Sequence, residues 1–250
     1  MNVTVTYEGH VATVEIDRPP HNHVSVELMA EVADALERLD EDQNIWAVVL
    51  CSAGKNFCAG ADLVKSTLGP GGLVTNELYS QAVRLFSTRK PIVAAVQGAA
   101  VGAGLGLALV GDFRVAGHDA KFAANFVKLG FHPGFGLTHT LPRLIGEQRA
   151  KLMFLTGRRI KADEALAWGL VDEVAGDPRE AATRLAVEIA ENAPLAVQST
   201  RKTLRGDIAA GVNAQTDHEH TEQSWLRQTE DYNEGVRSVA ERRVGNFQAR

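Results

Sequence analysis

Two glycine-containing turns are the parts of this sequence whose residue types could do chemistry. The first turn covers residues 56–63 and follows an apolar segment at 46–51, and the second covers 97–104 and follows an apolar segment at 92–96. A strand-to-helix turn leaves backbone N–H groups without intrahelical partners, and two such groups that converge on one point form an oxyanion hole. The alternative interpretation of the same residues is that both segments are tight packing turns.

Other chemical interpretations of the sequence are weaker. A dinucleotide fingerprint fails in every register, because Leu107 and Leu109 stand where the third glycine is required. A Walker A loop is absent, since the upstream glycine is missing. His218 and His220 are two residues apart, so on a helix they point about 200° apart and cannot share a metal ion. Cys58 has no histidine close to it in the sequence, and we favour a buried structural thiol over a nucleophile there.

The elements that must position the two turns alternate between strand and helix patterns. Residues 3–7 and 11–15 alternate apolar and polar side chains around a Glu8-Gly9-His10 turn, which predicts a β-hairpin. From Ser25, an N-cap candidate, apolar residues recur at three- and four-residue spacing and predict a helix to about Asp40. Two continuous apolar runs predict strands that are covered on both faces. Strands at 46–51, 92–96 and 113–115, with helices at 73–86 and 102–110, predict an α/β core with parallel strands.

The last quarter of the chain is predicted to be helical. After Gly176 the strand patterns stop, and helices are expected at 179–192, 194–205 and 207–228. We therefore divide the chain into a core at residues 1–192 and a helical C-terminal region at 193–250. A polar helical region that packs on one side only is expected to build an oligomer.

Composition excludes several classes of function. The 250 residues contain 26 Lys+Arg and 31 Asp+Glu, a net charge of −5, and no run of basic residues is longer than two. This balance argues against nucleic acid or an anionic membrane surface as a partner. No apolar stretch reaches 18 residues, and the first 20 residues do not resemble a signal peptide. Two cysteines are too few for a secreted disulfide framework, so we expect a cytoplasmic protein.

The two turns and several later motifs resemble the crotonase superfamily, the enoyl-CoA hydratase/isomerase family. The sequence FCAGAD at 57–62 is similar to its first signature, and KPIVAAVQG at 90–98, with Gly102, Gly104 and Asp112, is similar to its second. The resemblance covers nearly the whole chain in order. It continues through PGFG at 133–136, LTG at 155–157, ALAWGLVDEV at 165–174, EDYNEG at 230–235, ERR at 241–243 and Phe247.

The resemblance implies a fold, an assembly and a substrate. The fold is the crotonase (ClpP-like) spiral of ββα turns with a helical C-terminal trimerisation region, and the assembly is a homotrimer or a homohexamer made of two trimers. The substrate is an acyl-CoA or enoyl-CoA thioester, with no bound cofactor and no metal. The thioester oxygen, and then the enolate, is held by the backbone N–H groups of Ala61 and Ala103. Coenzyme A contacts are implied for Ala59, Gly60, Ala61, Asp62, Leu63, His21 and Arg242.

The sequence departs from the family at its carboxylates. Gly106 and Phe126 stand at the substrate-pocket positions of the two hydratase glutamates, and Gly134 stands where isomerases and dehalogenase-like members place a carboxylate. The usual two-glutamate hydration is therefore not available. Histidine titrates near neutrality, so His132 and His139 are the nearest replacements. The alternative is that His132 caps a turn and His139 faces a subunit contact.

Two hypotheses of function follow. The first is an enzyme that forms a thioester enolate with an atypical proton carrier, and Glu77, Tyr79 and Asp62 are weaker candidates for that carrier than His132. The apolar side chain of Phe126 favours isomerisation, C–C cleavage or thioester hydrolysis over hydration. The second hypothesis is a catalytically silent acyl-CoA-binding protein of the same fold.

Overall fold

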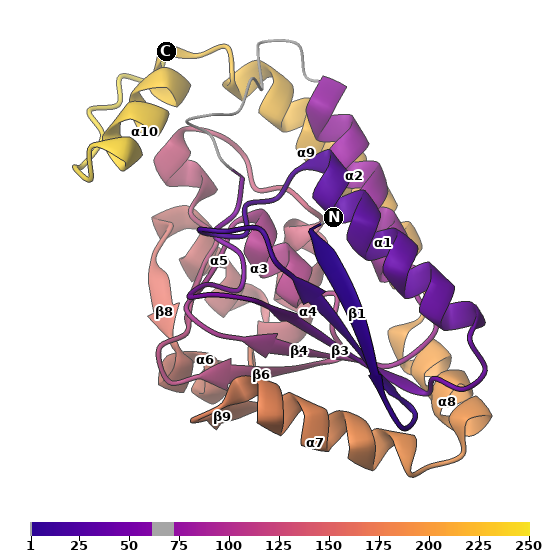
Figure 1. Cartoon of the computed structure of the whole chain (residues 1–250). Helices are drawn as coiled ribbons and strands as arrows, with labels where there is room; N and C mark the ends of the chain where they lie inside the picture. Colours follow the sequence, from indigo (N-terminus) through magenta and orange to yellow (C-terminus); the bar gives the residue numbers. More distant parts are fainter. Residues whose placement is uncertain (1, 62–72) are drawn as a thin grey trace.

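A six-stranded sheet forms the centre of the molecule (Figure 1). The computed structural model describes residues 2–61 and 73–250. The sheet order is β1-β2-β3-β4-β6-β9, and every neighbouring pair is parallel except the β1–β2 hairpin. The hairpin and the parallel core predicted from the sequence are therefore confirmed. The strands are β1 (Val3–Glu8), β2 (Val11–Ile16), β3 (Ala47–Ser52), β4 (Ile92–Val96), β6 (Phe113–Gly117) and β9 (Glu173–Ala175).

Both faces of this sheet are buried, which explains the continuous apolar runs. In β3, Val48 and Leu50 belong to the main core. Ala47, Val49 and Cys51 point to the other face and pack in a second cluster with alanines of α7 (Pro178–Ala190). Because successive side chains of a strand point to opposite faces, a strand covered on both sides needs apolar residues at every position. Figure 1 shows α7 lying across the sheet at the lower edge of the view.

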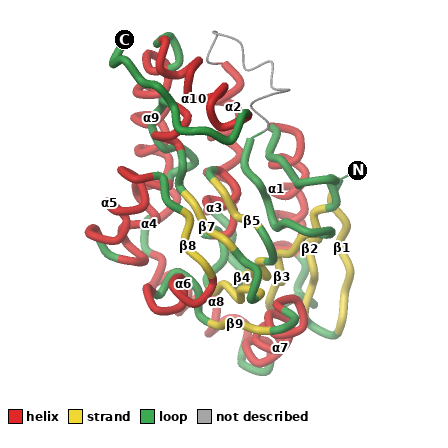
Figure 2. Tube along the Cα trace, turned by 90° about the vertical axis from the view of Figure 1, so that its left-hand side faces the viewer, coloured by secondary structure: helices red, strands yellow, loops and turns green. Residues whose placement is uncertain are grey.

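A smaller sheet stands beside the second glycine turn. It has the order β5-β7-β8, with β5 (Ala99–Val101), β7 (Lys121–Ala123) and β8 (Arg159–Lys161) (Figure 2). The chain repeats a strand, a second strand and a short helix, first as β4, β5 and α3 (Ala103–Ala108), then as β6, β7 and the 3₁₀ helix η1 (Phe126–Leu129). This repeat agrees with the expected ββα spiral. The α3 helix is shorter than the predicted 102–110.

Helices α1 (Val26–Glu41), α2 (Leu73–Phe86) and α9 (Ile208–Leu226) lie side by side at one edge of the core (Figure 1). The predicted N-cap of α1 is confirmed, because the Ser25 hydroxyl accepts a hydrogen bond from the Leu28 N–H at 3.2 Å. The segment between β7 and β9 adds helices that the sequence analysis did not assign. They are α4 (Leu137–Ile145), α5 (Glu147–Thr156) and α6 (Ala162–Trp168).

The C-terminal region is helical, as predicted, with α8 (Pro194–Arg205), α9 and α10 (Glu230–Ala240). An ion-pair cluster anchors α8 on the core, where Arg201 Nε lies 2.7 Å and Arg205 Nη1 lies 2.9 Å from the Asp112 carboxylate. At the other end of the molecule, α10 packs on η1. Among the residues described, no helix has both the length and the apolar composition needed to cross a membrane.

Candidate active site

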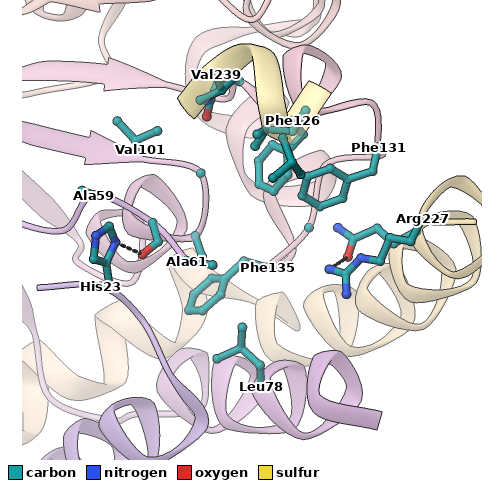
Figure 3. Close-up of a pocket in the computed structure, with 18 of the residues that line it drawn as sticks. His23, Ala59, Ala61, Leu78, Val101, Phe126, Phe131, Phe135, Arg227 and Val239 are labelled. Atoms are coloured by element: carbon teal, nitrogen blue, oxygen red, sulfur yellow. Dashed lines mark hydrogen bonds between the residues drawn. The ribbon is translucent and has the colours of Figure 1, made fainter. Parts of the chain in front are cut away.

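A cavity of about 250 Å³ lies between the two glycine turns and the C-terminal helices (Figure 3). Residues of both turns line it, together with residues of η1, α2, α9 and α10 and of the loop between η1 and α4. The lining residues are mostly apolar, and the described ones include neither Asp nor Glu. They are His23, Ala59, Gly60, Ala61, Leu78, Tyr79, Val101, Gly102, Ala103, Asn125, Phe126, Leu129, Phe131, Gly134, Phe135, Gln223, Arg227, Val236, Val239 and Ala240.

The second turn places Ala103 on the cavity. Gly102 has φ 56° and ψ −123°, a conformation that only glycine adopts readily, and it lets the chain turn from β5 into α3. A Cβ on Gly104 would overlap the carbonyl oxygen of Cys58, so the two turns approach each other through glycine. Ala103 is the first residue of α3, and its N–H donates no hydrogen bond to any residue within the described ranges.

The first turn places Ala61 on the same cavity. Gly60 has φ 86°, and a Cβ there would lie 2.7 Å from the Val101 carbonyl oxygen. The Gly60 carbonyl accepts a hydrogen bond from the Val24 N–H at 3.0 Å, and the His23 Nδ1 lies 3.0 Å from the same oxygen. The Ala61 N–H has no hydrogen-bond acceptor among residues 2–61 and 73–250.

The three positions at which the sequence analysis expected the family's carboxylates lie differently around the cavity. Phe126 lines the cavity, and its ring packs edge-on against Phe131 with 5.5 Å between ring centroids. Gly134 also lines it. Gly106 does not, and a Cβ there would lie only 2.9 Å from Phe135 Cγ. Position 106 therefore has no room for a glutamate while Phe135 keeps its place.

Tyr79 brings a polar group into this apolar wall. It lies on α2 and is 5% exposed. The Gln223 amide and the Phe135 N–H lie near its hydroxyl, and each lowers the pKa of Tyr79 in part. Burial raises the pKa of Tyr79 well above its usual range, and the Glu219 carboxylate adds to the effect.

A buried carboxylate of α9 holds the loop at residues 134–138. Glu219 is fully buried and accepts hydrogen bonds from the Gly136 N–H at 2.8 Å, the Thr138 N–H at 3.0 Å and the Thr138 hydroxyl at 2.6 Å. Burial raises the pKa of Glu219 to about 7, although these hydrogen bonds oppose the shift.

The two histidines expected to act as acid or base lie outside the cavity. His132 Nδ1 lies 2.8 Å from the Pro133 carbonyl oxygen, and its ring meets the edge of His218 at 5.8 Å in a neighbouring pocket. His139 packs against Gly211, and burial, followed by Arg143, lowers its pKa. These positions do not support the acid–base role for either histidine, because neither ring borders the cavity that contains Ala61 and Ala103.

Only some of the residues expected to contact coenzyme A line the cavity. Ala59, Gly60 and Ala61 line the cavity, whereas Asp62 and Leu63 lie outside the described residues. His21 does not line the cavity; its Nδ1 lies 3.1 Å from the Asn56 amide nitrogen, and its ring meets the edge of His23 at 5.5 Å. Arg242 is exposed beyond the end of α10.

Two further interpretations of the sequence can be judged from the structure. Cys58 is fully buried and is not among the cavity residues, and burial raises the pKa of its thiol to about 11. It packs as a structural thiol. Within residues 2–61 and 73–250, no group of three or more His, Cys, Asp or Glu side chains could hold a metal ion.

Sequence reasoning missed the far wall of the cavity. Gln223 and Arg227, from the end of α9, both line it. Figure 3 shows Arg227 on the side opposite Ala59 and Ala61, and its guanidinium lies 5.3 Å over the Phe131 ring. No short motif marks these residues. The one signal in the sequence is the four-residue spacing of Glu219 and Gln223, which puts both on one face of a helix. The structure shows that this face is buried.

Comparison with known proteins identifies the family. The sequence model described as Enoyl-CoA hydratase/isomerase matches residues 6–250. The chain belongs to the enoyl-CoA hydratase/isomerase family. It is 40% identical over 223 residues to a probable enoyl-CoA hydratase of Mycobacterium tuberculosis, a match that covers 87% of this chain and 86% of the relative. It is 32% identical over 250 residues to the 1,2-epoxyphenylacetyl-CoA isomerase of Escherichia coli, covering 96% and 95%.

A solved structure supports the same assignment. The enoyl-CoA hydratase/isomerase of Pseudoalteromonas atlantica superposes with a TM-score of 0.88 at 31% identity, and the match covers 99% of this chain and all of that one. The crotonase fold predicted from the sequence is thereby confirmed. Membership in this family makes the chain an enzyme of the enoyl-CoA hydratase/isomerase type.

Proposed function

We propose that this enzyme binds an acyl-CoA or enoyl-CoA thioester and stabilises its enolate with the backbone N–H groups of Ala61 and Ala103. The observation that carries the proposal is that both alanines line one apolar cavity and that neither N–H donates a hydrogen bond to another described residue. A thioester oxygen gains negative charge as the enolate forms. Hydrogen-bond donors in a mostly apolar cavity therefore stabilise the enolate more than the ground state.

The residues present favour some reactions of an enolate over others. Hydration of an enoyl thioester needs a positioned acid and base, each of which contributes roughly 10²- to 10⁴-fold. Positions 106 and 126 hold Gly and Phe, and no carboxylate occurs among the described cavity residues. We therefore infer isomerisation, C–C cleavage or thioester hydrolysis in preference to two-glutamate hydration.

A second candidate function is favoured by the same observation. A cavity that keeps the two N–H groups but whose described wall lacks a carboxylate suits a protein that binds acyl-CoA without converting it. The two candidates differ in one measurable property, which is the exchange of protons next to the thioester.

The coenzyme A contacts and the assembly are part of the proposal. Residues 59–63, with His21 and Arg242, would contact coenzyme A, which is a substrate component, so no separate cofactor is required. The C-terminal region at 193–250 would form a homotrimer or homohexamer. Its α8 helix exposes Leu195 by 80% and Leu204 by 81%, apolar surface that an oligomer would cover. The cytoplasmic location stays a prediction.

The test is deuterium exchange from D₂O into a panel of acyl- and enoyl-CoA thioesters, followed by mass spectrometry. The informative variant is Ala103→Pro, which removes one N–H at the first helical position, where proline is tolerated. Loss of one oxyanion donor should slow exchange about 10²- to 10³-fold. Glu147→Pro is the matched control, because Glu147 is the exposed first residue of α5 and lies outside the cavity.

The outcomes separate the candidates. Exchange by the wild type and by Glu147→Pro, with slow exchange and retained thioester affinity in Ala103→Pro, is the expected result. A thioester that binds the wild type without any exchange would overturn the enzymatic proposal in favour of the silent binding protein. An equal decrease in the exchange rate in Ala103→Pro and Glu147→Pro would show that the Ala103 N–H has no special role in exchange.

A further inference from the structure

The Tyr79 hydroxyl lies in a mostly apolar cavity, in the space that a side chain at position 134 would need. A Cβ on Gly134 would overlap the Tyr79 hydroxyl oxygen and would lie 2.6 Å from Gln223 Nε2. Tyr79 and Gln223 together thus replace the missing side chain at position 134 with a polar group from α2 and another from α9.

Neighbouring contacts fix the orientation of the Gln223 amide. Its Nε2 donates a hydrogen bond to the His132 carbonyl oxygen at 2.8 Å, and its Oε1 accepts one from Arg227 Nη2 at 3.1 Å. The amide nitrogen therefore lies on the side of Tyr79, with a second hydrogen to donate. The Tyr79 oxygen can only be the acceptor in that contact.

The hydroxyl of Tyr79 then has one donor hydrogen that no described hydrogen bond uses. A hydroxyl has two acceptor lone pairs and one donor hydrogen. The Gln223 amide and the Phe135 N–H are both donor groups that lie near the oxygen, so they can use its acceptor sites but not its hydrogen. In the described part of the chain no hydrogen bond has Tyr79 as its donor. Because Tyr79 lines the cavity, its O–H group is available to an acceptor inside it.

The charge around Tyr79 keeps this proton in place. The tyrosine is buried, and the Glu219 carboxylate raises its pKa further, so the neutral phenol is the stable form. A neutral phenol in this setting donates a hydrogen bond and does not act as a base. An apolar acyl group would leave the donor without an acceptor, which is unfavourable inside a cavity.

We propose that the Tyr79 hydroxyl donates a hydrogen bond to an oxygen atom of the acyl group, beyond the thioester carbonyl, and that the cavity thereby selects oxygenated acyl-CoA esters. The chemical class comprises oxo-, hydroxy- and carboxyacyl thioesters. The inference rests on the proposed function, since it assumes that this cavity holds the acyl group. Gln223 is a positioning residue, because it acts through the tyrosine oxygen.

The test compares thioesters of matched length by isothermal titration calorimetry. Butanoyl-CoA is the apolar reference, and 3-oxobutanoyl-CoA, 3-hydroxybutanoyl-CoA and succinyl-CoA are the oxygenated esters. The wild type should bind at least one oxygenated ester about tenfold more tightly than butanoyl-CoA. Tyr79→Phe should lose this preference, because it removes the hydrogen bond to the oxygenated ester and also removes the donor that butanoyl-CoA leaves without an acceptor. Tyr7→Phe is the control, since Tyr7 is 62% exposed on β1.

A second variant guards against misfolding of the first. Gln223→Met keeps the length of the side chain but removes the amide beside Tyr79, so it should reduce the preference for oxygenated esters, whereas the Tyr7→Phe control should keep it. A wild type that binds oxygenated and apolar esters equally, or a Tyr79→Phe variant that keeps the preference, would overturn the inference. Failure of the proposed function looks different: in that case no thioester exchanges deuterium, whatever its acyl group.

Discussion

The hydroxyl oxygen of Tyr79 lies so close to Gly134 that it would overlap a Cβ at that position. The two residues lie on different elements, one on α2 and the other in the loop before α4, and they are complementary in size. Tyr79 can therefore keep its place only if residue 134 has no side chain. Two changes at this contact should therefore be coupled energetically.

Gly134→Ala should destabilise the protein by about 1–3 kcal/mol, because the added methyl group must displace either Tyr79 or Gln223. In the Tyr79→Phe background the nearest clashing atom is gone, so the cost should fall by about 1 kcal/mol. Urea unfolding of the four proteins in the cycle measures this coupling. Strictly additive effects would show that the two side chains do not compete for the same space.

Elements that depend on local pattern could be predicted from the sequence. The β1–β2 hairpin follows from alternation, α1 from its spacing and the Ser25 cap, and β3 from its continuous apolar run. The two glycine turns could be assigned to one site because their glycines and alanines recur in a family signature. The structure brings Ala61 and Ala103 to the same cavity.

The histidine prediction depended on contacts that no local pattern contains. The direction of His132 and the course of the loop after it are set by α9, where Gln223 and Glu219 bond to residues more than eighty positions earlier. The polar wall formed by Tyr79 and Gln223 likewise depends on contacts between elements that are far apart in the sequence. Long-range packing decides which side of a loop faces a cavity, so the sequence motif around His132 could not show that its ring would border a different pocket.

Position 106 should not accept a side chain while Phe135 keeps its place. Gly106→Ala should cost about 1–3 kcal/mol in the free energy of unfolding, because the new Cβ meets the Phe135 ring. Gly106→Glu should cost more, since it also buries a carboxylate. Chemical denaturation measures both. Gly176→Ala is the control, because Gly176 is exposed and a Cβ there meets nothing within 4 Å. Wild-type stability in Gly106→Ala would contradict the packing argument.

Asp112 should be the main anchor between α8 and the core. Its carboxylate pairs with Arg201 and Arg205 and also accepts a hydrogen bond from the Ile92 N–H at 2.8 Å. Asp112→Ala leaves two largely buried guanidinium groups without this partner and should cost about 3–5 kcal/mol. Glu230→Ala, which removes an exposed ion pair with Arg250, should cost about 1 kcal/mol or less. Urea unfolding measures the free energy of unfolding of both variants. Similar decreases in Asp112→Ala and Glu230→Ala would refute the anchoring role of Asp112.

Glu219 should make stability depend on pH in one direction. Its pKa is about 7 in the folded protein, against an ordinary value of 4.5. Below about pH 4.5 the carboxyl is protonated in the folded and unfolded chains alike. Between about pH 4.5 and 7 mainly the unfolded chain releases this proton, so the folded state loses stability as the pH rises. The loss should total about 3 kcal/mol and level off above pH 7.

The measurement is the difference in unfolding free energy between the wild type and Glu219→Gln at pH 4, 5.5, 7 and 8.5. Because glutamine does not titrate, the wild type should become less stable relative to the variant across this range, while contributions from all other groups cancel. Glu147→Gln, at an exposed position of α5, controls for the loss of one negative charge. A difference that stays flat, or that moves in favour of the wild type as the pH rises, would mean that the hydrogen bonds from Gly136 and Thr138 outweigh burial and keep Glu219 ionised.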